Sequence, residues 1–589
     1  MRNKVVGSGR LILLIAVVVF LVWAGAIPGN FVYDDFSLIV DNAFIKSFRN
    51  IPFLFSSNYI ASPVRDYFYN GTYNLGSGES SYRPVATVTY MLNYALFGLR
   101  PWGWRLVNVL LHVASSVLLY ILLLRLFANP RLSALGALLF GVHPLSSEVI
   151  ACVGFRPNIL AMLFSLLAIL SYFKSRDNIR PGRFFYFSLS LFCFFMALFC
   201  KEIAVFLPAA LFVSEYYRQG GSLKKALAGW RGYLCYLAVA LIYLWVYFFL
   251  RQPTQHIFDL GAGPGNILRM SDVFGAYLRD MVFPRDLVMV PPMQVRNSYL
   301  NIALGAVFII GSIFVILKRR RFPAALSFGA LWFFIWSLPM NNPLNNFRIL
   351  LANRFMYLPL AGFAVIIAAL LTMPDNEGNG FGLRFPLLKK VLPLACVVFF
   401  SIFTLTTNPL WKDELSVCMA VAEKYPHAPT GHVDLGEAWF KRGNYPEALR
   451  EFDAAVSRSH NRLSIFDFTR IYSDAGMIYM SRGNYKKAEE KYREAIANEP
   501  GMPYFYVSLA VCYARQGLYA RALNELDAAK RLTPSYVLAY IKSGDVYSLM
   551  GRHKDARREF EEALNIDPGS REAADKLKGL LDNRRGSDR

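Results

Sequence analysis

Cysteine is scarce in this chain of 589 residues, which has seven cysteines and no CxxC pair. Most of them lie within apolar segments, and Cys418 and Cys512, which do not, are far apart in the sequence. A disulfide framework or a cysteine-based zinc site needs clustered or regularly spaced cysteines. The sequence therefore predicts neither, and the compartment has to be inferred from membrane topology.

Charged residues are also few, at 18% of the chain, whereas 55% is hydrophobic and 15% aromatic. This composition is too apolar for a soluble protein of such length and predicts a membrane protein. The net charge of +22 does not indicate a nucleic-acid partner, because it is unevenly distributed. Of the 63 basic and 41 acidic residues, 28 and 26 lie from Trp411 onward, so the surplus belongs to short loops of the apolar part, where it sets orientation. We expect membrane lipid as a partner and no nucleic acid.

Hydropathy predicts about eleven membrane spans. The first, Leu11–Ile27, follows three basic residues, as a signal peptide does. We expect it to remain uncleaved as a membrane span, with its N-terminus in the cytoplasm. The segment from Tyr82 to Leu99 is short and bounded by Arg83 and Arg100, so we place it at the membrane interface. The other ten predicted spans are Trp102–Phe127, Leu132–Ala151, Asn158–Phe173, Phe184–Cys200, Ile203–Tyr217, Tyr233–Leu250, Tyr299–Leu317, Phe322–Leu338, Phe355–Leu371 and Val391–Thr407.

Five successive loops on one side of this arrangement are rich in lysine and arginine, which supports the assignment of sides. An odd number of spans then places everything after Thr407 on the outer side. The stretch FVYDDFSLIVDN, which contains the adjacent carboxylates Asp34 and Asp35, lies on that same side. A carboxylate pair next to a membrane span is costly and has no packing purpose, so it predicts chemistry at the bilayer surface.

Four further polar groups are predicted at the outer ends of spans. Each residue taken alone is explained as well by snorkelling or helix capping, but their convergence on one face favours a site. The four groups are His143 with Glu148, Arg156 in the turn GFRPN, Lys201 with Glu202, and Arg348 with Arg354 and Tyr357. Arg83 is a further candidate of the same site.

Together these residues meet the requirements of a reaction on a lipid phosphate. Fixed cationic side chains at headgroup depth would bind an anionic donor and stabilise the charge that builds on its leaving phosphate. A carboxylate such as Asp34 or Asp35 would serve as general base for the acceptor. The same two carboxylates could instead hold a divalent cation such as Mg²⁺ or Mn²⁺, so no cofactor is firmly implied.

The C-terminal part contains about four copies of one pattern. Gly436, Gly476, Ala510 and Gly544 head the copies, the last three at a spacing of 34 residues, and an insertion near Asn461–Thr469 lengthens the first. Each copy has an aromatic residue three positions later, a turn glycine and two small residues. This is typical of tetratricopeptide repeats, which pair helices closely and bind peptides or partner proteins in a concave groove. We predict an all-α protein with a transmembrane domain over 1–410 and a repeat domain over 411–589.

The combined motifs resemble the transmembrane and tetratricopeptide-repeat O-mannosyltransferases, which are polytopic type C glycosyltransferases. The similarity rests on FVYDDFSLIVDN, the SYRPVATVTYMLNYALFGLRPWGWRLVNVLLH run, FGVHPLSSEVIACVGFRPNILA, FCKEIAVFLP, NRFMYLPLAGF and the repeats. It implies an inverting transfer of mannose or another hexose from a polyprenyl-phosphate donor to a protein hydroxyl. It also implies that an aspartate of the first outer loop is the base and that the basic residues hold the donor phosphate. Asn158 stands where relatives often carry an acidic residue.

Two alternatives stay open at this point. A glycosyltransferase acting on lipid-linked glycan or envelope polysaccharide would share the membrane part. A non-enzymatic scaffold would use its spans only to anchor the repeats. We expect a multi-pass protein of the bacterial cytoplasmic membrane with an extracytoplasmic site and repeats, or of the endoplasmic-reticulum membrane with lumenal repeats if the source is eukaryotic.

Overall fold

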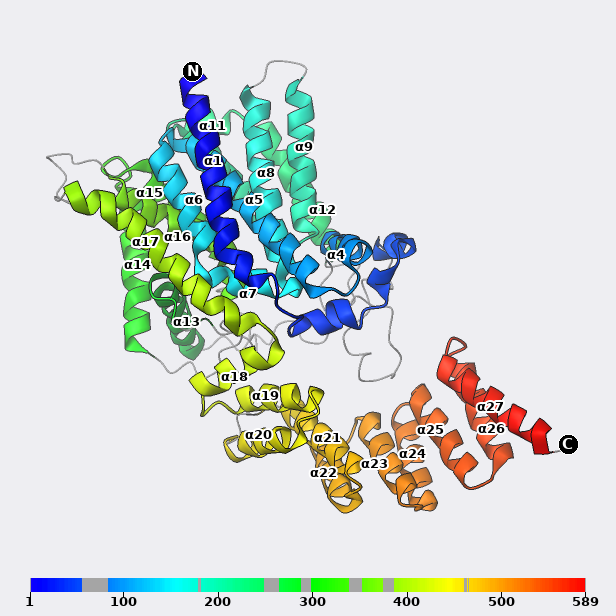
Figure 1. Ribbon diagram of the computed structural model, residues 1–589. Coiled ribbons are helices and arrows are strands. Elements are labelled where there is room, and N and C mark those ends of the chain that lie inside the picture. The colour runs from blue at the N-terminus through cyan, green and yellow to red at the C-terminus, as the bar shows by residue number, and fades with distance from the viewer. Residues whose placement is uncertain are drawn as a thin grey trace. The chain divides into compact units, whose positions relative to one another are not determined.

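The computed structural model describes residues 2–55, 83–177, 182–247, 264–285, 287, 298–337, 352–373, 386–459, 463 and 465–587, and within these residues it is helical with no strand (Figure 1). This confirms the predicted all-α class. The described residues fall into two compact units, the first reaching Val417 and the second beginning at Cys418, inside α18 (Glu414–Lys424). The first unit is the apolar part, and the second contains the repeats.

Most helices of the first unit are apolar, and prolines mark the first turns of several of them. Pro84, Pro101 and Pro130 each stand at the start of a helix, where the missing N–H costs nothing. The helices are α1 (Arg2–Trp23), α4 (Pro84–Phe97), α5 (Pro101–Phe127), α6 (Pro130–Val142), α7 (Ser147–Ala151), α8 (Arg156–Asp177), α9 (Gly182–Leu198), α10 (Leu207–Arg218), α11 (Leu223–Leu227), α12 (Trp230–Trp245), α13 (Pro264–Val282), α14 (Tyr299–Leu317), α15 (Ala324–Ser337), α16 (Tyr357–Leu371) and α17 (Pro386–Thr407).

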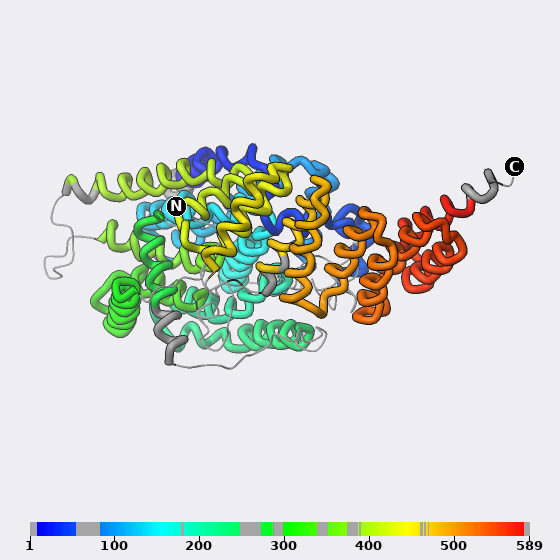
Figure 2. The backbone as a smooth tube through the Cα atoms, turned by 90° about the horizontal axis from the view of Figure 1, so that it is seen from below, coloured from blue at the N-terminus to red at the C-terminus, as the bar shows by residue number. Residues whose placement is uncertain are grey.

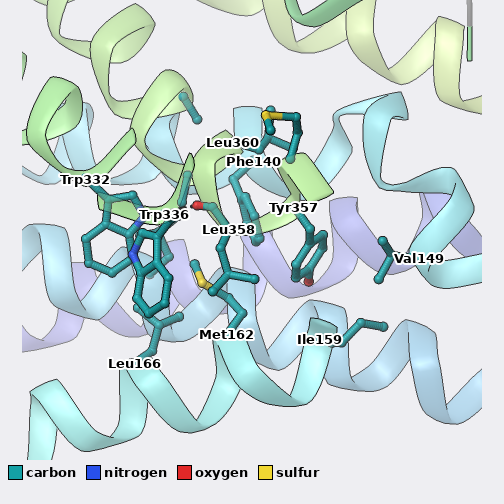
Figure 3. Close-up of a cluster of buried hydrophobic side chains, with 14 of the residues drawn as sticks. Phe140, Val149, Ile159, Met162, Leu166, Trp332, Trp336, Tyr357, Leu358 and Leu360 are labelled. Atoms are coloured by element: carbon teal, nitrogen blue, oxygen red, sulfur yellow. Dashed lines mark hydrogen bonds between the residues drawn. The ribbon is translucent and has the colours of Figure 1, made fainter. Parts of the chain in front are cut away.

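The core of this unit lies where α6, α8, α15 and α16 meet. Trp332 and Trp336 of α15, Met162 of α8 and Phe140 of α6 are buried there (Figure 3). Small residues allow the backbones of α15 and α16 to touch: a Cβ added at Gly362 would lie 2.5 Å from the carbonyl oxygen of Gly329. Close packing through small residues is typical of helices in membranes.

The predicted number of spans is not confirmed by helix length. Six described helices are long and apolar enough to cross a membrane, or seven if α6 and α7, which bend by 46° around Pro144, count as one. Three predicted spans are shorter apolar helices, namely α9, α12 and α15. The predicted span Ile203–Tyr217 is divided between a 3-10 turn, Glu202–Phe206, and the 12 residues of α10. Hydropathy therefore found the apolar segments but overestimated how many are single long helices. As predicted, α4 is short, with 14 residues.

The second unit consists of paired helices stacked in sequence (Figure 2), which confirms the predicted repeats. Its helices are α19 (Pro429–Lys441), α20 (Tyr445–Ser457), α21 (Ile465–Ser481), α22 (Tyr485–Asn498), α23 (Pro503–Arg515), α24 (Tyr519–Leu532), α25 (Val537–Leu549), α26 (His553–Ile566) and α27 (Arg571–Ser587). The turn glycines Gly443, Gly483, Gly517 and Gly551 have φ of 71° to 76°, which side chains other than glycine rarely adopt. At 17 residues, α21 is longer than the 13-residue α19, and its start lies in the predicted insertion.

Gly476→Ala is expected to destabilise the repeats by about 1–3 kcal/mol, as overpacking does in a filled core. A Cβ at Gly476 would lie 2.5 Å from the ring of Tyr492, which is only 2% exposed and cannot move aside. Gly579→Ala in α27 is the matched control, because nothing lies within 4 Å of its Cβ position. The rate of limited proteolysis of the repeats in the purified full-length protein measures the difference. Equal rates in both variants would contradict this packing.

Candidate functional site

Asp35 lies in the segment after α1 and is fully buried. One carboxylate oxygen accepts hydrogen bonds from the backbone N–H of Gly154, at 2.7 Å, and the thiol of Cys152, at 3.3 Å. The other accepts from the N–H of Val32, at 3.1 Å. Burial raises the pKa of Asp35 to about 6, although these hydrogen bonds favour its charged form. Asp35 thus fastens the segment after α1 to the turn that precedes α8.

Asp34 differs from its neighbour, because its side chain is exposed. The surrounding protein still removes enough water to raise its pKa, and the positive charges of Arg354 and Arg83 oppose that rise. The preceding residue, Tyr33, has a φ of 49°, which is uncommon for a bulky side chain. Backbone strain of this kind gathers at functional sites, and here it directly precedes the aspartate pair.

Glu148 and Arg354 form a buried ion pair beside Asp34. Glu148, in α7, has a fully buried side chain, and its carboxylate accepts a hydrogen bond from the backbone N–H of Arg354 at 3.1 Å and another from the Arg354 guanidinium. The guanidinium carbon also lies 4.3 Å from the ring centre of Phe155. The carboxylate of Glu148 and the ring of Phe155 therefore hold this guanidinium in place. The Arg354 side chain remains 13% exposed.

A second group of charges lies between α4 and α10. Arg83 contacts Glu202 at 3.2 Å, and its side chain is 19% exposed. The ammonium of Lys201, which is almost completely buried, donates a hydrogen bond to the side-chain oxygen of Asn158. The Asn158 amide in turn donates to the backbone of Phe155 at 2.9 Å. The neutral amide at position 158 thus orients Lys201 without neutralising it.

These two groups and Asp34 form one electrostatic neighbourhood. The positive charges of Arg354 and Arg83 interact electrostatically with Asp34. The ammonium of Lys201 interacts in the same way with the charges of Arg83, Glu202, Arg354 and Glu148. The sequence-predicted residues that the structure brings together are Asp34, Asp35, Arg83, Glu148, Lys201, Glu202 and Arg354. The arrangement is an accessible carboxylate on which two fixed guanidinium groups act electrostatically. Such a carboxylate can accept a proton, and such guanidinium groups can bind an oxyanion.

Arg156 and His143 occupy structural positions. Arg156 has no exposed surface and donates to the side chain of Asn108 at 2.7 Å and to the backbone of Trp104 at 3.1 Å, with further contacts to Asn93 and Thr89. His143 uses both ring nitrogens, one with the carbonyl of Met281 and one with the N–H of Leu145. The geometry therefore does not favour the prediction that they bind a donor phosphate, because protein groups already occupy their polar atoms.

Tyr357 is also separate from this neighbourhood. Its hydroxyl lies 2.7 Å from a ring nitrogen of His112, and its ring packs on Phe140 in the core (Figure 3). Tyr357 therefore lies in a buried hydrogen-bond network, and its predicted role in donor binding stays a prediction. The remaining predicted residue, Arg348, lies outside the described residues.

Three polar residues of α5 were missed by sequence reasoning. Arg105 donates to the backbone carbonyls of Ala26 and Trp411, at 3.0 and 2.8 Å, and so holds the 3-10 turn after α1 against the turn after α17. Asn108 bonds Arg156, and His112 bonds Tyr357. Residues 105, 108 and 112 share one face of a 27-residue apolar helix, and this polar stripe was a readable signal.

Asp34 is the more accessible of the two carboxylates to a metal, since Asp35 is buried and both of its oxygens already accept hydrogen bonds. Within the described residues, no group of three or more histidine, cysteine, aspartate or glutamate side chains is placed to hold a metal ion. The predicted alternative of a divalent cation thus has one accessible carboxylate to bind to.

Comparisons with known proteins bear on both units. Family models of the tetratricopeptide repeat match residues 420–462, 473–537 and 537–570. The protein O-mannosyl-transferase TMTC3 of Mus musculus is 24% identical over 607 residues, covering 94% of this chain and 63% of that protein. The predicted resemblance to O-mannosyltransferases is confirmed.

Further O-mannosyl-transferases show the same similarity. TMTC4 of Homo sapiens is 25% identical, over 75% of this chain and 65% of that protein. TMTC1 of Homo sapiens is 34% identical over 164 residues, which are 27% of this chain and 17% of that protein. The chain spans less than two thirds of the length of these O-mannosyl-transferases.

Proposed function

We propose that the protein is a membrane glycosyltransferase that moves mannose or another hexose from a polyprenyl-phosphate donor to a protein hydroxyl, on the extracytoplasmic side. The observation that carries this proposal is the accessible carboxylate of Asp34, on which the positive charges of Arg354 and Arg83 act while Glu148 and Glu202 hold those two guanidinium groups. Similarity to the protein O-mannosyl-transferases supports the choice of sugar and acceptor.

In the proposed reaction, the acceptor hydroxyl oxygen attacks the anomeric carbon of the sugar while the bond from that carbon to the phosphate oxygen breaks. Asp34 takes the hydroxyl proton. The donor phosphodiester has one negative charge, and the released polyprenyl phosphate gains a second. A single displacement of this kind inverts the anomeric carbon, and fixed cations stabilise the charge that develops in its transition state.

Arg354 is the strongest candidate to receive that charge. In the described residues its side chain uses one N–H on Glu148, whereas a guanidinium carries five N–H donors. Glu148 and Phe155 hold it in place, so little ordering is required when phosphate binds. Arg83, which Glu202 holds, is a second cation that acts on Asp34. Lys201 adds a third cation.

The repeats are proposed to dock the acceptor protein or a partner. Their match to tetratricopeptide models supports this role, since such arrays bind extended peptides in a concave surface. Residence in a bacterial cytoplasmic membrane, or in an endoplasmic-reticulum membrane, remains part of the proposal.

Incubation of purified protein with a panel of polyprenyl-phosphate sugars and an acceptor protein tests the activity directly. Sugar appearing on the acceptor, with release of polyprenyl phosphate, supports the proposal. Transfer to lipid-linked glycan but not to protein would favour the other acceptor class, and no turnover with any donor would contradict the proposal.

The pH dependence of this transfer provides a further prediction. A general base must be ionised, so the rate is expected to fall as pH falls through the pKa of Asp34, which lies above the model-peptide value of 3.8. The acidic limb of the kcat profile should therefore lie above that value. A rate that stays constant down to pH 4 would contradict Asp34 as the base.

A further inference from the structure

A cavity of about 960 Å³ lies at the end of α8 that is remote from Gly154. It is bounded by the last turn of α8, the first turns of α9 and the start of α12, and Figure 1 shows α8 and α9 side by side. Three arginines, Arg176, Arg183 and Arg231, line it together with the aromatic side chains of Tyr172, Phe187 and Trp230.

Two glycines help to shape this cavity. A Cβ at Gly229 would lie 2.7 Å from the hydroxyl of Tyr172, and one at Gly232 would lie 3.4 Å from the ring of Phe187. Both glycines line the cavity. The start of α12 therefore approaches the aromatic wall closely while contributing backbone, and no bulky side chain, at these two positions.

The arginines of the cavity have no acidic partner within the part of the chain that the structure describes. Among the described residues, no carboxylate forms an ion pair with Arg176, Arg183 or Arg231. Asp177, the acidic residue next to Arg176 in the chain, is paired with Arg218 at 2.6 Å and Arg125 at 3.4 Å. Three guanidinium groups around one aromatic cavity have the charge and the hydrogen-bond donors to bind an anion.

The depth of the cavity in the membrane indicates which kind of anion it can bind. α8 has 22 residues, and at about 1.5 Å per residue it spans roughly 33 Å, close to the thickness of a bilayer hydrocarbon core. Its first residues adjoin the Asp35 neighbourhood, so its last residues reach the headgroup level of the opposite leaflet. Phe184 and Trp230 are 79% and 54% exposed there, as in an interfacial aromatic belt.

We propose that this cavity binds an anionic phospholipid, with the headgroup phosphate held by the three arginines and an acyl chain along Phe184 and Phe187. The site is separate from the one that contains Asp34, because the two lie at opposite ends of α8. The proposal does not depend on the glycosyltransferase function. Arg176, Arg183 and Arg231 belong to the basic loops that predict membrane orientation, and a lipid ligand gives them a further role.

Binding of phosphatidylglycerol to the full-length protein in a zwitterionic detergent tests the proposal. The variant Arg176→Gln/Arg183→Gln/Arg231→Gln is expected to weaken phosphatidylglycerol binding by at least about tenfold, since each arginine contributes severalfold near an anionic lipid. The control Lys224→Gln/Lys225→Gln/Arg320→Gln removes the same charge from other basic positions, none of which lines the cavity. It should bind within about twofold of the unaltered protein. Phosphatidylcholine should bind weakly to all three proteins.

A second variant keeps the test decisive if the triple variant fails to fold. Gly232→Leu retains all three arginines and places a bulky side chain in the cavity, and its Cβ position, 3.4 Å from Phe187, is compatible with ordinary packing. It should also weaken phosphatidylglycerol binding. Equal losses in the control and the triple variant would reduce the effect to general surface charge and overturn the site. Competition by millimolar inorganic phosphate as effective as that by phosphatidylglycerol would assign the site to free phosphate and overturn a lipid ligand.

Discussion

Asp34→Asn is expected to lower the turnover of sugar transfer by about 10²- to 10⁴-fold, because an amide cannot take the proton of the acceptor hydroxyl. Asp34 is the accessible carboxylate of the pair, and the charges of Arg354 and Arg83 act on it. The substitution keeps the volume and removes no hydrogen bond that holds the segment after α1. Expression and melting temperature should therefore stay close to those of the unaltered protein.

Asp35→Asn should have a different profile. Its two carboxylate oxygens accept from Gly154, Cys152 and Val32, and an amide has one oxygen to replace both. Stability should fall by about 1–3 kcal/mol, the cost of an unsatisfied buried donor, with a smaller loss of turnover than in Asp34→Asn. Asp41→Asn, an exposed aspartate of the same segment, is the matched control. Single-turnover transfer and thermal unfolding separate the two effects.

The same assay distinguishes a base from a metal ligand. If the aspartates hold a divalent ion, transfer by the unaltered protein should collapse in chelator and return with Mg²⁺ or Mn²⁺. We favour Asp34 as a base that needs no metal. Full activity in the double variant Asp34→Asn/Asp35→Asn would end the enzymatic interpretation of this segment.

Arg354→Gln is expected to have the second large effect, on stability and on donor binding together. Glu148 is buried in α7, and removal of its partner leaves an uncompensated charge, which typically costs about 3–5 kcal/mol. Loss of the guanidinium should also weaken binding of the donor phosphate. The exposed pair of Arg125 and Asp177 is the control, and Arg125→Gln should change stability by less than about 1 kcal/mol.

The double variant Glu148→Gln/Arg354→Gln separates the two consequences. With both charges removed, no buried ion is left without a partner, so most of the stability should return. Donor affinity and turnover should stay low, because the cation that faces the phosphate is still missing. Recovery of both stability and turnover in the double variant would show that the pair is structural and that Arg354 does not contact the donor.

The roles of the two neighbouring aspartates could not be read from the chain. The two aspartates have nearly the same local sequence, so a local pattern cannot distinguish them. Their burial differs because the N–H of Gly154, 119 residues further along the chain, donates a hydrogen bond to Asp35. Arg156 and Arg354 illustrate the same point. Both are arginines at the ends of predicted spans, yet one is enclosed by Asn108 and Trp104 while the other stays partly accessible beside Asp34.

The sequence by itself determined the all-α class, the apolar segments and the repeats, because each depends on composition or on a local period. The turn glycines and buried alanines of the repeats recur at fixed spacing, and the contacts they make lie within one or two repeats. Only the tertiary structure decided which apolar segments are long single helices, which polar residues cap or fasten the bundle, and which remain accessible. Those outcomes depend on contacts between residues far apart in the chain, such as Glu148 with Arg354 and Arg105 with Trp411, for which a local pattern contains no signal.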